Sequence, residues 1–446
     1  MHRGGAIGKA LRLLVPALLL LLAGGALFDV AGVARSSKRH PARSHALRVF
    51  ERGRHIFRYD SFGDEAFWGR QLHLHEAIAG RRNGGVGPGV SPKAALAAGL
   101  KVDAARLPRA LRRALRRGRV NLDSPRTTLA LLRLNAVVGV RGRFSRSGRR
   151  LRSVGITCAL CHSTVNNSFA KGIGRRRDGW PNRDLNVGAI VALAPSLKPF
   201  ADLLGTDEGT VRSVLRSWGP GKFDAALVLD GKAFRPDGRS AATLIPAAFG
   251  LDGVNLATYT GNGTATYWNA FVANLAMHGR GTFYDPRLNN PSRFPIATRA
   301  GFFNVRNSPD LITPKLGPLH VYELALPTPK PPRGSFNRRR ARRGKRIFEG
   351  KGRCASCHVP PRYSEPGTNL HRPEEICTDA FQAARSPTGM YRTTPLRGLF
   401  TRRKGGFFHD GRFRSLGATV EHYNGCFGLN LSGAEKRDLV EFLKSL

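Results

Sequence analysis

Apolar residues recur at helical spacing in several separate stretches of the chain, and this pattern predicts a mainly α-helical protein. Turn signals that contain Gly and Pro lie between these stretches and predict long irregular loops, such as the Gly-rich residues 81–93. An apolar segment over residues 126–140 leads through a basic, hairpin-like turn toward Cys158. The helices expected in this part of the chain cover residues 62–79, 107–117, 187–193, 268–277 and 317–326.

The C-terminal part of the chain has a more regular order. The pattern predicts an amphipathic helix over residues 340–350 that ends in a glycine, then a long loop region over 359–432. A closing helix is expected over 434–446, with three apolar residues on one face: Leu439, Phe442 and Leu443.

A Pro-rich segment separates the two parts, and consecutive prolines favour an extended chain. We therefore expect an N-terminal domain with irregular insertions over residues 61–326, a stiff linker over 327–339 and a C-terminal domain over 340–446.

The start of the chain is typical of an exported protein. A basic beginning is followed by an uncharged apolar run over residues 13–28, which predicts a signal peptide or an uncleaved N-terminal anchor within residues 1–34. A basic linker is expected over 35–60. The predicted location is periplasmic or otherwise extracytoplasmic, with membrane association through the N-terminal segment as an alternative to release.

The chain is strongly basic, with 73 Lys and Arg against 30 Asp and Glu and a net charge of +43. Such a charge raises nucleic acid as a partner, but the basic residues are spread along the chain and no recognition motif accompanies them. We therefore expect no nucleic-acid binding. The charge favours a small electron-transfer protein or another acidic redox partner.

Two copies of the motif C-x-x-C-H carry the clearest chemical signal: residues 158–162 read CALCH and residues 354–358 read CASCH. This motif attaches c-type haem through two thioether bonds and places the adjacent histidine under the iron. A redox dithiol does not need that histidine, and a zinc site would want a second C-x-x-C nearby. The sequence predicts two covalently attached haems, with His162 and His358 as iron ligands, held by Cys158, Cys161, His162, Cys354, Cys357 and His358.

Two cysteines remain, Cys377 and Cys426. In an oxidising compartment they predict a disulfide between the loop after the second motif and the segment before the last helix. The alternative is two unpaired, small apolar residues.

The order of helix, C-x-x-C-H, wrapping loop and closing helix in the C-terminal part resembles that of class I cytochromes c. Residues 391–424, YRTTPLRGLFTRRKGGFFHDGRFRSLGATVEHYN, resemble the corresponding segment of bacterial di-haem cytochrome c peroxidases. They are also similar to the di-haem enzymes that mature tryptophylquinone cofactors and, more distantly, to haem-dependent rubber oxygenases. The resemblance implies a mainly α fold with two cytochrome c-like haem domains, the C-terminal one class I-like.

The same resemblance implies a peroxide-reacting N-terminal haem and an electron-transferring C-terminal haem. His409 matches the histidine of the family's FHDG-type turn, and the family's spacing from that turn places Tyr423 at the distal ligand position. Ordinary peroxidases have a methionine there, whereas the quinone-maturing enzymes have a tyrosine. Met390 is the alternative, because class I cytochromes draw their methionine from that interval; further alternatives are His409 and His422.

The distal side of the N-terminal haem has several candidate ligands: His73, His75, Met277, His278 and His320. An open iron would need a polar acid–base group above it, and Glu65 and Glu76 are candidates, although no catalytic residue is assigned. Four tryptophans are candidates for electron relays, with core packing as the alternative: Trp68, Trp180, Trp218 and Trp268. The family's calcium ion stays a candidate without assigned ligands, because no acidic cluster has calcium-loop spacing.

Two functions follow from these observations. The first is an oxidoreductase that couples electron transfer to peroxidase-like reduction of peroxide or to a related haem oxidation. The second is a plain electron carrier in which both irons are six-coordinate. The large irregular region around the first motif and the tyrosine at the ligand position favour the first. The substrate is not specified by the sequence.

Overall fold

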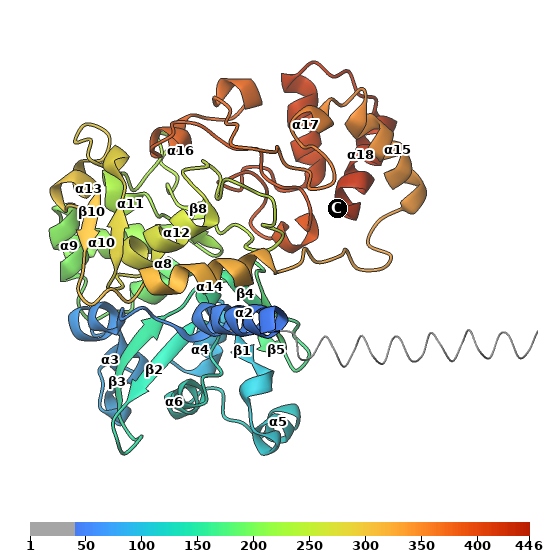
Figure 1. Ribbon diagram of the computed structural model, residues 1–446. Coiled ribbons are helices and arrows are strands. Elements are labelled where there is room, and N and C mark those ends of the chain that lie inside the picture. Colours follow the sequence, from blue (N-terminus) through green and yellow to red (C-terminus); the bar gives the residue numbers. More distant parts are fainter. Residues whose placement is uncertain (1–40) are drawn as a thin grey trace, which may run out of the picture. The chain divides into compact units, whose positions relative to one another are not determined.

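Helices dominate the computed structural model, which describes residues 41–446 (Figure 1). Of the described residues, those up to Arg52 belong to one unit, and Gly53–Leu446 form a second compact unit. The predicted signal peptide or anchor lies outside the described residues. No helix within residues 41–446 combines the length and the hydropathy that crossing a bilayer requires.

The α-helices are mostly short. They are α2 (Pro41–Tyr59), α3 (Leu74–Ala79), α4 (Pro92–Ala97), α5 (Arg109–Arg116), α6 (Pro125–Arg133), α7 (Ala159–His162), α8 (Val187–Val191), α9 (Lys198–Leu204), α10 (Glu208–Ser217), α11 (Leu227–Asp230), α12 (Ala265–Phe271), α13 (Pro295–Arg299), α14 (Thr313–Leu324), α15 (Arg338–Glu349), α16 (Phe381–Ala384), α17 (Leu416–Cys426) and α18 (Gly433–Ser445).

The strands of the described chain form two-stranded pairs only. One pair is parallel, β1 (Val102–Asp103) with β5 (Ile173–Gly174). The antiparallel pairs are β2 (Val140–Phe144) with β3 (Leu151–Ile156), β4 (Ser163–Val165) with β6 (Arg176–Asp178), β7 (Lys222–Phe223) with β8 (Thr243–Leu244), and β9 (Thr282–Tyr284) with β10 (Asn304–Arg306). The mainly α character is confirmed, while the division into two haem domains stays a prediction.

The predicted single helix over residues 62–79 is wrong. A π-helix over Ala66–Gln71 is followed by a break, and α3 begins only at Leu74. His73 occupies the break in a left-handed conformation, with φ of 55°. Helical spacing in the sequence does not reveal such a break, because apolar residues on both sides still face the core. The helix α2 was not expected either, because residues 35–60 were predicted to be a basic linker.

The basic turn before the first motif is confirmed as an antiparallel hairpin, β2–β3. Helix α6 precedes it, and Leu132 of α6 is buried against the hairpin core beside Leu151 and Val154. The hairpin ends at Ile156, two residues before Cys158. Gly139, just before β2, allows a close approach to the motif, because a Cβ atom there would lie 2.1 Å from the Leu160 Cα atom.

The C-terminal part is built on the contact between α15 and α18 (Figure 1). The two helices approach each other at Gly344, where a Cβ atom would lie 2.0 Å from the Asp438 carbonyl oxygen. Phe348 packs on Phe442 with ring centroids 5.1 Å apart. The predicted helices over 340–350 and 434–446 are confirmed within two residues at each end.

The predicted loop region over 359–432 contains a helix that the sequence pattern did not indicate. Helix α17 covers Leu416–Cys426, begins at the N-cap Ser415 and contacts α18. Its apolar and polar residues are not segregated strongly, so helical periodicity is weak there. This helix carries both Tyr423 and Cys426.

Candidate functional site

The C-terminal C-x-x-C-H motif opens onto a cavity of about 450 Å³. Cys354 and Cys357 lie in and directly after a short 3₁₀ turn, and both line the cavity together with His358. Apolar side chains from α15, α17, α18 and the intervening loops form most of the wall. A volume of this size is typical of pockets that enclose a whole cofactor.

His358 is held in a defined orientation. Its Nδ1 atom lies 3.2 Å from the Tyr363 carbonyl oxygen. A carbonyl can only accept, so Nδ1 carries the proton and Nε2 keeps its lone pair. Desolvation lowers the pKa of His358 to about 4, so the ring is neutral at physiological pH. A neutral imidazole with an anchored Nδ1–H is the form in which histidine binds a metal.

The two cysteines of this motif are unpaired, protonated thiols. Desolvation raises the pKa of Cys354 to about 11 and also raises that of Cys357. Redox dithiols depend instead on a thiol with a lowered pKa. The environment of Cys354 and Cys357 therefore disfavours the redox-dithiol alternative.

Three arginines line the same cavity and have incomplete hydrogen bonding. Arg183, Arg392 and Arg402 each have a buried guanidinium nitrogen without a partner. Burial lowers the pKa of each, to about 10 for Arg392 and for Arg402. Buried cations with vacant donors are costly unless an anion accepts from them. The cavity thus fits a flat apolar group with carboxylate substituents, and haem, with its two propionates, is such a group.

Of the predicted distal ligands of the second haem, the cavity brings together Tyr423 and His409 with the motif. Burial raises the pKa of Tyr423 to about 12, and the nearby Cys354 and Cys357 contribute to the same shift. Met390 is exposed to 36% and is not among the lining residues. His422 points elsewhere, since its Nε2 atom lies 2.8 Å from the Cys377 carbonyl oxygen. The geometry favours Tyr423 over Met390.

His409 is committed to a charge network. Its Nε2 atom lies 3.3 Å from an Asp379 carboxylate oxygen, and Asp379 also pairs with Arg412 and Arg235. His409 and Arg412 together hold the pKa of Asp379 far below its usual value. The ligand atoms of Asp379, His409 and Asp410 lie close enough to one another to hold a metal ion. The two arginines already neutralise the carboxylates, so this cluster does not supply the unassigned calcium site.

The N-terminal motif repeats the arrangement of the C-terminal one. The His162 Nδ1 atom lies 3.2 Å from the Pro246 carbonyl oxygen, and desolvation lowers the pKa of His162 to about 4. Cys158 and Cys161 are unpaired, and burial raises the pKa of both thiols. The same neutral, anchored histidine beside two protonated thiols therefore occurs twice in the chain.

One acidic residue near this motif was missed by the sequence analysis. Glu323 of α14 is 4% exposed, and burial raises its pKa to about 7. It lies close enough to Cys158 for its charge to raise the thiol pKa. Asn269 donates a hydrogen bond of 2.6 Å to its carboxylate. The only sequence signal was its position one helical turn after His320, and nothing in the sequence placed either residue beside Cys158.

The other N-terminal candidates have contacts of their own. His73 lies 3.2 Å from the Glu76 carboxylate, and His75 lies 3.8 Å from it. His278 is stacked on Phe67 at 3.6 Å. Glu65 accepts from Ser61 and pairs with Arg143. Met277 is buried, and its backbone carbonyl accepts from the Trp68 indole.

His320 has a buried Nδ1 atom without a hydrogen-bond partner. It shares a helix with Glu323, the acid beside Cys158. The His75 Nδ1 atom is also buried without a hydrogen-bond partner, so both His75 and His320 stay candidates for a distal role.

Of the four tryptophans predicted as candidate electron relays, Trp180 lies next to the C-terminal cavity. Trp180 lies edge-on against Phe400 with centroids 5.6 Å apart, and the neighbours Leu399 and Arg402 line the C-terminal cavity. Two residues after Trp180, the backbone N–H group of Asn182 donates to the Cys161 carbonyl oxygen at 2.8 Å. The other tryptophans pack against aromatic rings, as the alternative predicted: Trp68 on Phe67, Trp218 on Phe223 and Trp268 on Phe271.

No protein-family model matches the chain. The methylamine utilization protein MauG of Methylorubrum extorquens is 33% identical over 123 residues, which cover 24% of this chain and 34% of MauG. The chain spans about a third of the length of this curated relative. Over these residues the chain is a weak homologue of MauG, and this supports the di-haem cytochrome c peroxidase superfamily. The resemblance predicted from the sequence is thereby confirmed at the level of the superfamily.

Two solved structures were also found. A MauG-like protein associated with microbial copper homeostasis is 14% identical, with 52% of this chain and 79% of that chain covered and a TM-score of 0.32. Hydrazine synthase of Kuenenia stuttgartiensis is 19% identical, with 48% and 76% covered and a TM-score of 0.28. Both scores lie below the level at which a shared fold is inferred.

Proposed function

We propose that this protein is an exported di-haem c-type cytochrome that couples electron transfer to the reduction of peroxide. The observation that carries the proposal is the repeated unit of a neutral histidine, anchored at Nδ1 by a backbone carbonyl, beside two protonated thiols. Haem would supply a redox-active iron at each unit. The superfamily homology supports this assignment.

At the C-terminal site the chain's residues bind and orient the cofactor. Cys354 and Cys357 would hold it by thioether bonds, and His358 would present Nε2 to the metal. Arg183, Arg392 and Arg402 donate to the propionates, which removes the cost of their buried, vacant N–H groups. Tyr423 presents its hydroxyl oxygen from the wall of the same cavity.

At the N-terminal site Cys158, Cys161 and His162 bind the cofactor in the same way. Glu323 moves the proton that peroxide cleavage requires. A carboxyl group with a pKa of about 7 exists in both protonation states, so Glu323 could accept a proton from one peroxide oxygen and return it to the other if haem were held at this site. Asn269 orients the carboxylate through its hydrogen bond.

A short route links the two sites through the protein. Asn182 contacts the carbonyl of Cys161, and its neighbour Arg183 lines the C-terminal cavity. Trp180 extends the same segment toward Phe400. Electrons from a small acidic donor protein would enter at the C-terminal site and pass along this segment. The overall reaction takes two electrons and two protons per peroxide and yields two water molecules.

The test uses the purified full chain. Haem staining after denaturation, with a pyridine haemochrome assay, should give two covalent haems per chain. Low-temperature EPR of the fully oxidised and one-electron-reduced protein should show a high-spin ferric signal that peroxide abolishes. Two low-spin signals that ignore peroxide in both states would contradict the enzyme and would indicate the plain electron carrier.

A further inference from the structure

The Cys377–Cys426 disulfide joins two segments that both form the wall of the C-terminal cavity. Cys377 is flanked by Ile376 and Thr378, which line the cavity. Cys426 is the last residue of α17 and directly precedes Phe427, another lining residue. The bond predicted from the cysteine count therefore closes part of the cavity rim, in addition to linking distant parts of the sequence.

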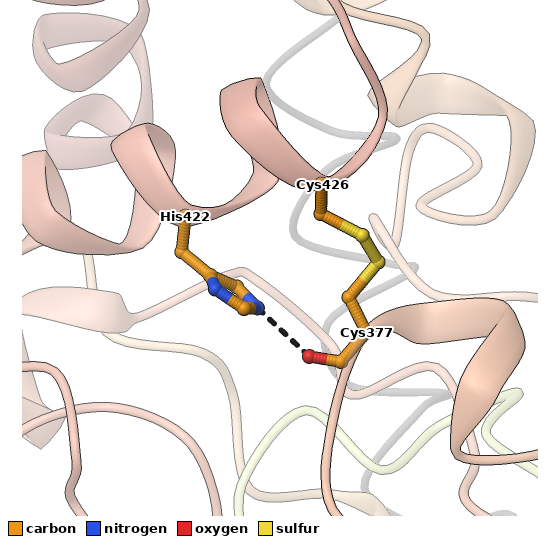
Figure 2. The surroundings of a disulfide bond; sticks show 3 residues. All are labelled: Cys377, His422 and Cys426. Carbon is orange, nitrogen blue, oxygen red and sulfur yellow. Dashed lines mark hydrogen bonds between the residues drawn. A yellow bond between two sulfur atoms is a disulfide. The ribbon is translucent and has the colours of Figure 1, made fainter.

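A second attachment joins the same two segments, as Figure 2 shows. The His422 Nε2–H group donates to the Cys377 carbonyl oxygen at 2.8 Å. His422 and Cys426 lie one helical turn apart on α17, so both face the same side of the helix. The last turn of α17 is thus held to the single residue Cys377 by one covalent bond and one hydrogen bond.

Tyr423 belongs to that last turn. Its ring stacks on Phe427 at 5.6 Å with an interplanar angle of 4°, and Phe408 lies on it at 5.7 Å. Phe427 is 43% exposed, so this side of the stack is open to solvent. The position of the tyrosine consequently depends on how firmly the last turn of α17 is held.

Local hydrogen bonds close the end of this helix: the Phe427 and Leu429 N–H groups donate to the Tyr423 and Asn424 carbonyls, and the Leu431 N–H group donates to the Asn424 side chain. The disulfide and the His422 hydrogen bond are the attachments that join this turn to the segment around Cys377. Residues 425–428 are exposed, and they include two glycines, which are poor helix formers. Cys426 itself is exposed, and a soluble thiol reductant can reach it.

We propose that the Cys377–Cys426 disulfide is a redox-cleavable clamp that positions Tyr423 as the distal ligand of the C-terminal haem. The proposal rests on the proposed function, because it requires haem in this cavity. A dithiol gives two electrons and two protons to the bond, the S–S bond breaks, two thiols form, and the dithiol becomes a disulfide. The last turn of α17 then loosens, and Tyr423 leaves its ligand position.

The test compares reduced wild-type protein with a variant that lacks the tyrosine hydroxyl. Purified oxidised protein is treated with dithiothreitol, alkylated with iodoacetamide, freed of reagents and returned to the ferric state with ferricyanide. We expect the EPR and absorption signals of the C-terminal haem to become those of Tyr423→Phe. The converted fraction should equal the alkylated fraction of Cys377 and Cys426 measured by mass spectrometry.

Three variants serve as controls. Cys377→Ser/Cys426→Ser should carry the Tyr423→Phe-like signal before treatment and should not respond to dithiothreitol. Tyr423→Phe should show no further change after reduction. Met390→Leu, at an exposed residue outside the cavity, should keep both the wild-type signal and the response.

The outcomes separate the clamp from the proposed function. Reduced and alkylated wild-type protein that keeps its original signal would overturn the clamp while leaving haem binding intact. A Tyr423→Phe protein with the wild-type signal would also overturn it, because the tyrosine would not be the ligand. Absence of covalent haem in the wild type would overturn the proposed function, and the clamp with it. If the double serine variant does not fold, the chemical reduction of wild-type protein still decides.

Discussion

At the scale of single residues, the environment of Glu323 governs the proposed chemistry. Burial on α14 raises its pKa to about 7, and the Asn269 amide holds its carboxylate. A group with a pKa near the working pH exists in both protonation states and can both accept and donate a proton. The two predictions at this scale concern this residue.

Glu323→Gln should lower peroxide turnover by about 10²- to 10⁴-fold, the usual contribution of a general acid–base group. The amide fills the same space but carries no transferable proton. In the wild type, kcat/KM for peroxide should rise as pH increases through about 7, where Glu323 loses its proton. The variant should lack this inflection. Glu65→Gln, at a residue already paired with Ser61 and Arg143, is the matched control and should retain wild-type turnover.

The same residue should make stability depend on pH. A free glutamate has a pKa of about 4.3, so the folded state binds more protons than the unfolded state between about pH 4.5 and 7. The contribution of Glu323 to the free energy of unfolding therefore falls as pH rises through this window. Urea denaturation at pH 5 and pH 7.5 should show a smaller loss for Glu323→Gln than for the wild type. Equal losses would mean that the carboxyl group is ionised at both pH values.

At the scale of elements, the contact between α15 and α18 organises the C-terminal part. Gly344 lets the helices approach, and the Arg343 guanidinium pairs with Asp438 at 2.9 Å beside it. The capping box of Ser432 and Glu435 begins α18. Both helices then place Phe348 and Phe442 beside the cavity that holds the second motif.

Gly344→Val should destabilise the protein by roughly 3 kcal/mol, in the range of strong overpacking. The added side chain meets the backbone of α18, which cannot rotate away as a flexible side chain would. Thermal unfolding followed by circular dichroism measures the change. Gly317→Ala on α14 is the control, since a Cβ atom there has open space, and it should be neutral or slightly stabilising. A stable Gly344→Val protein would mean that the helices separate without cost.

At the scale of the whole unit from Gly53 onward, Arg385 fastens the C-terminal segment to the preceding region. Its guanidinium pairs with Asp224 at 3.1 Å and with Asp230 at 2.8 Å, and all three side chains are at most 2% exposed. The Lys232 carbonyl accepts a further hydrogen bond of 2.7 Å. Removing any one of these side chains leaves an uncompensated buried charge and lowers the stability of the fold.

Arg385→Met should therefore cost about 3–5 kcal/mol, because two buried carboxylates lose their cation. Chemical denaturation of the holoprotein measures the loss. Arg239→Gln removes a cation from an exposed pair with Asp237 and should change stability by less than about 1 kcal/mol. Equal effects of the two substitutions would refute the role of burial.

The local chemistry of the cofactor sites could be predicted from the sequence, because the C-x-x-C-H motif carries its whole ligand pattern within five residues. The helices α15 and α18 were predictable for a similar reason, since their apolar faces repeat at helical spacing. The disulfide followed from counting cysteines. The resemblance then supplied Tyr423, and the structure places that residue on the cavity wall.

The remaining features depend on contacts between residues far apart in the chain. Glu323 lies beside Cys158 only because α14 folds back onto the first motif, and its raised pKa comes from that burial. The three arginines at the second cavity come from separate segments, and no local pattern joins them. The sequence alone determined which groups are proposed to bind haem, since the attachment motif is a local pattern. The tertiary structure alone decided which other side chains lie beside the two motifs, because burial and proximity arise only when distant segments pack.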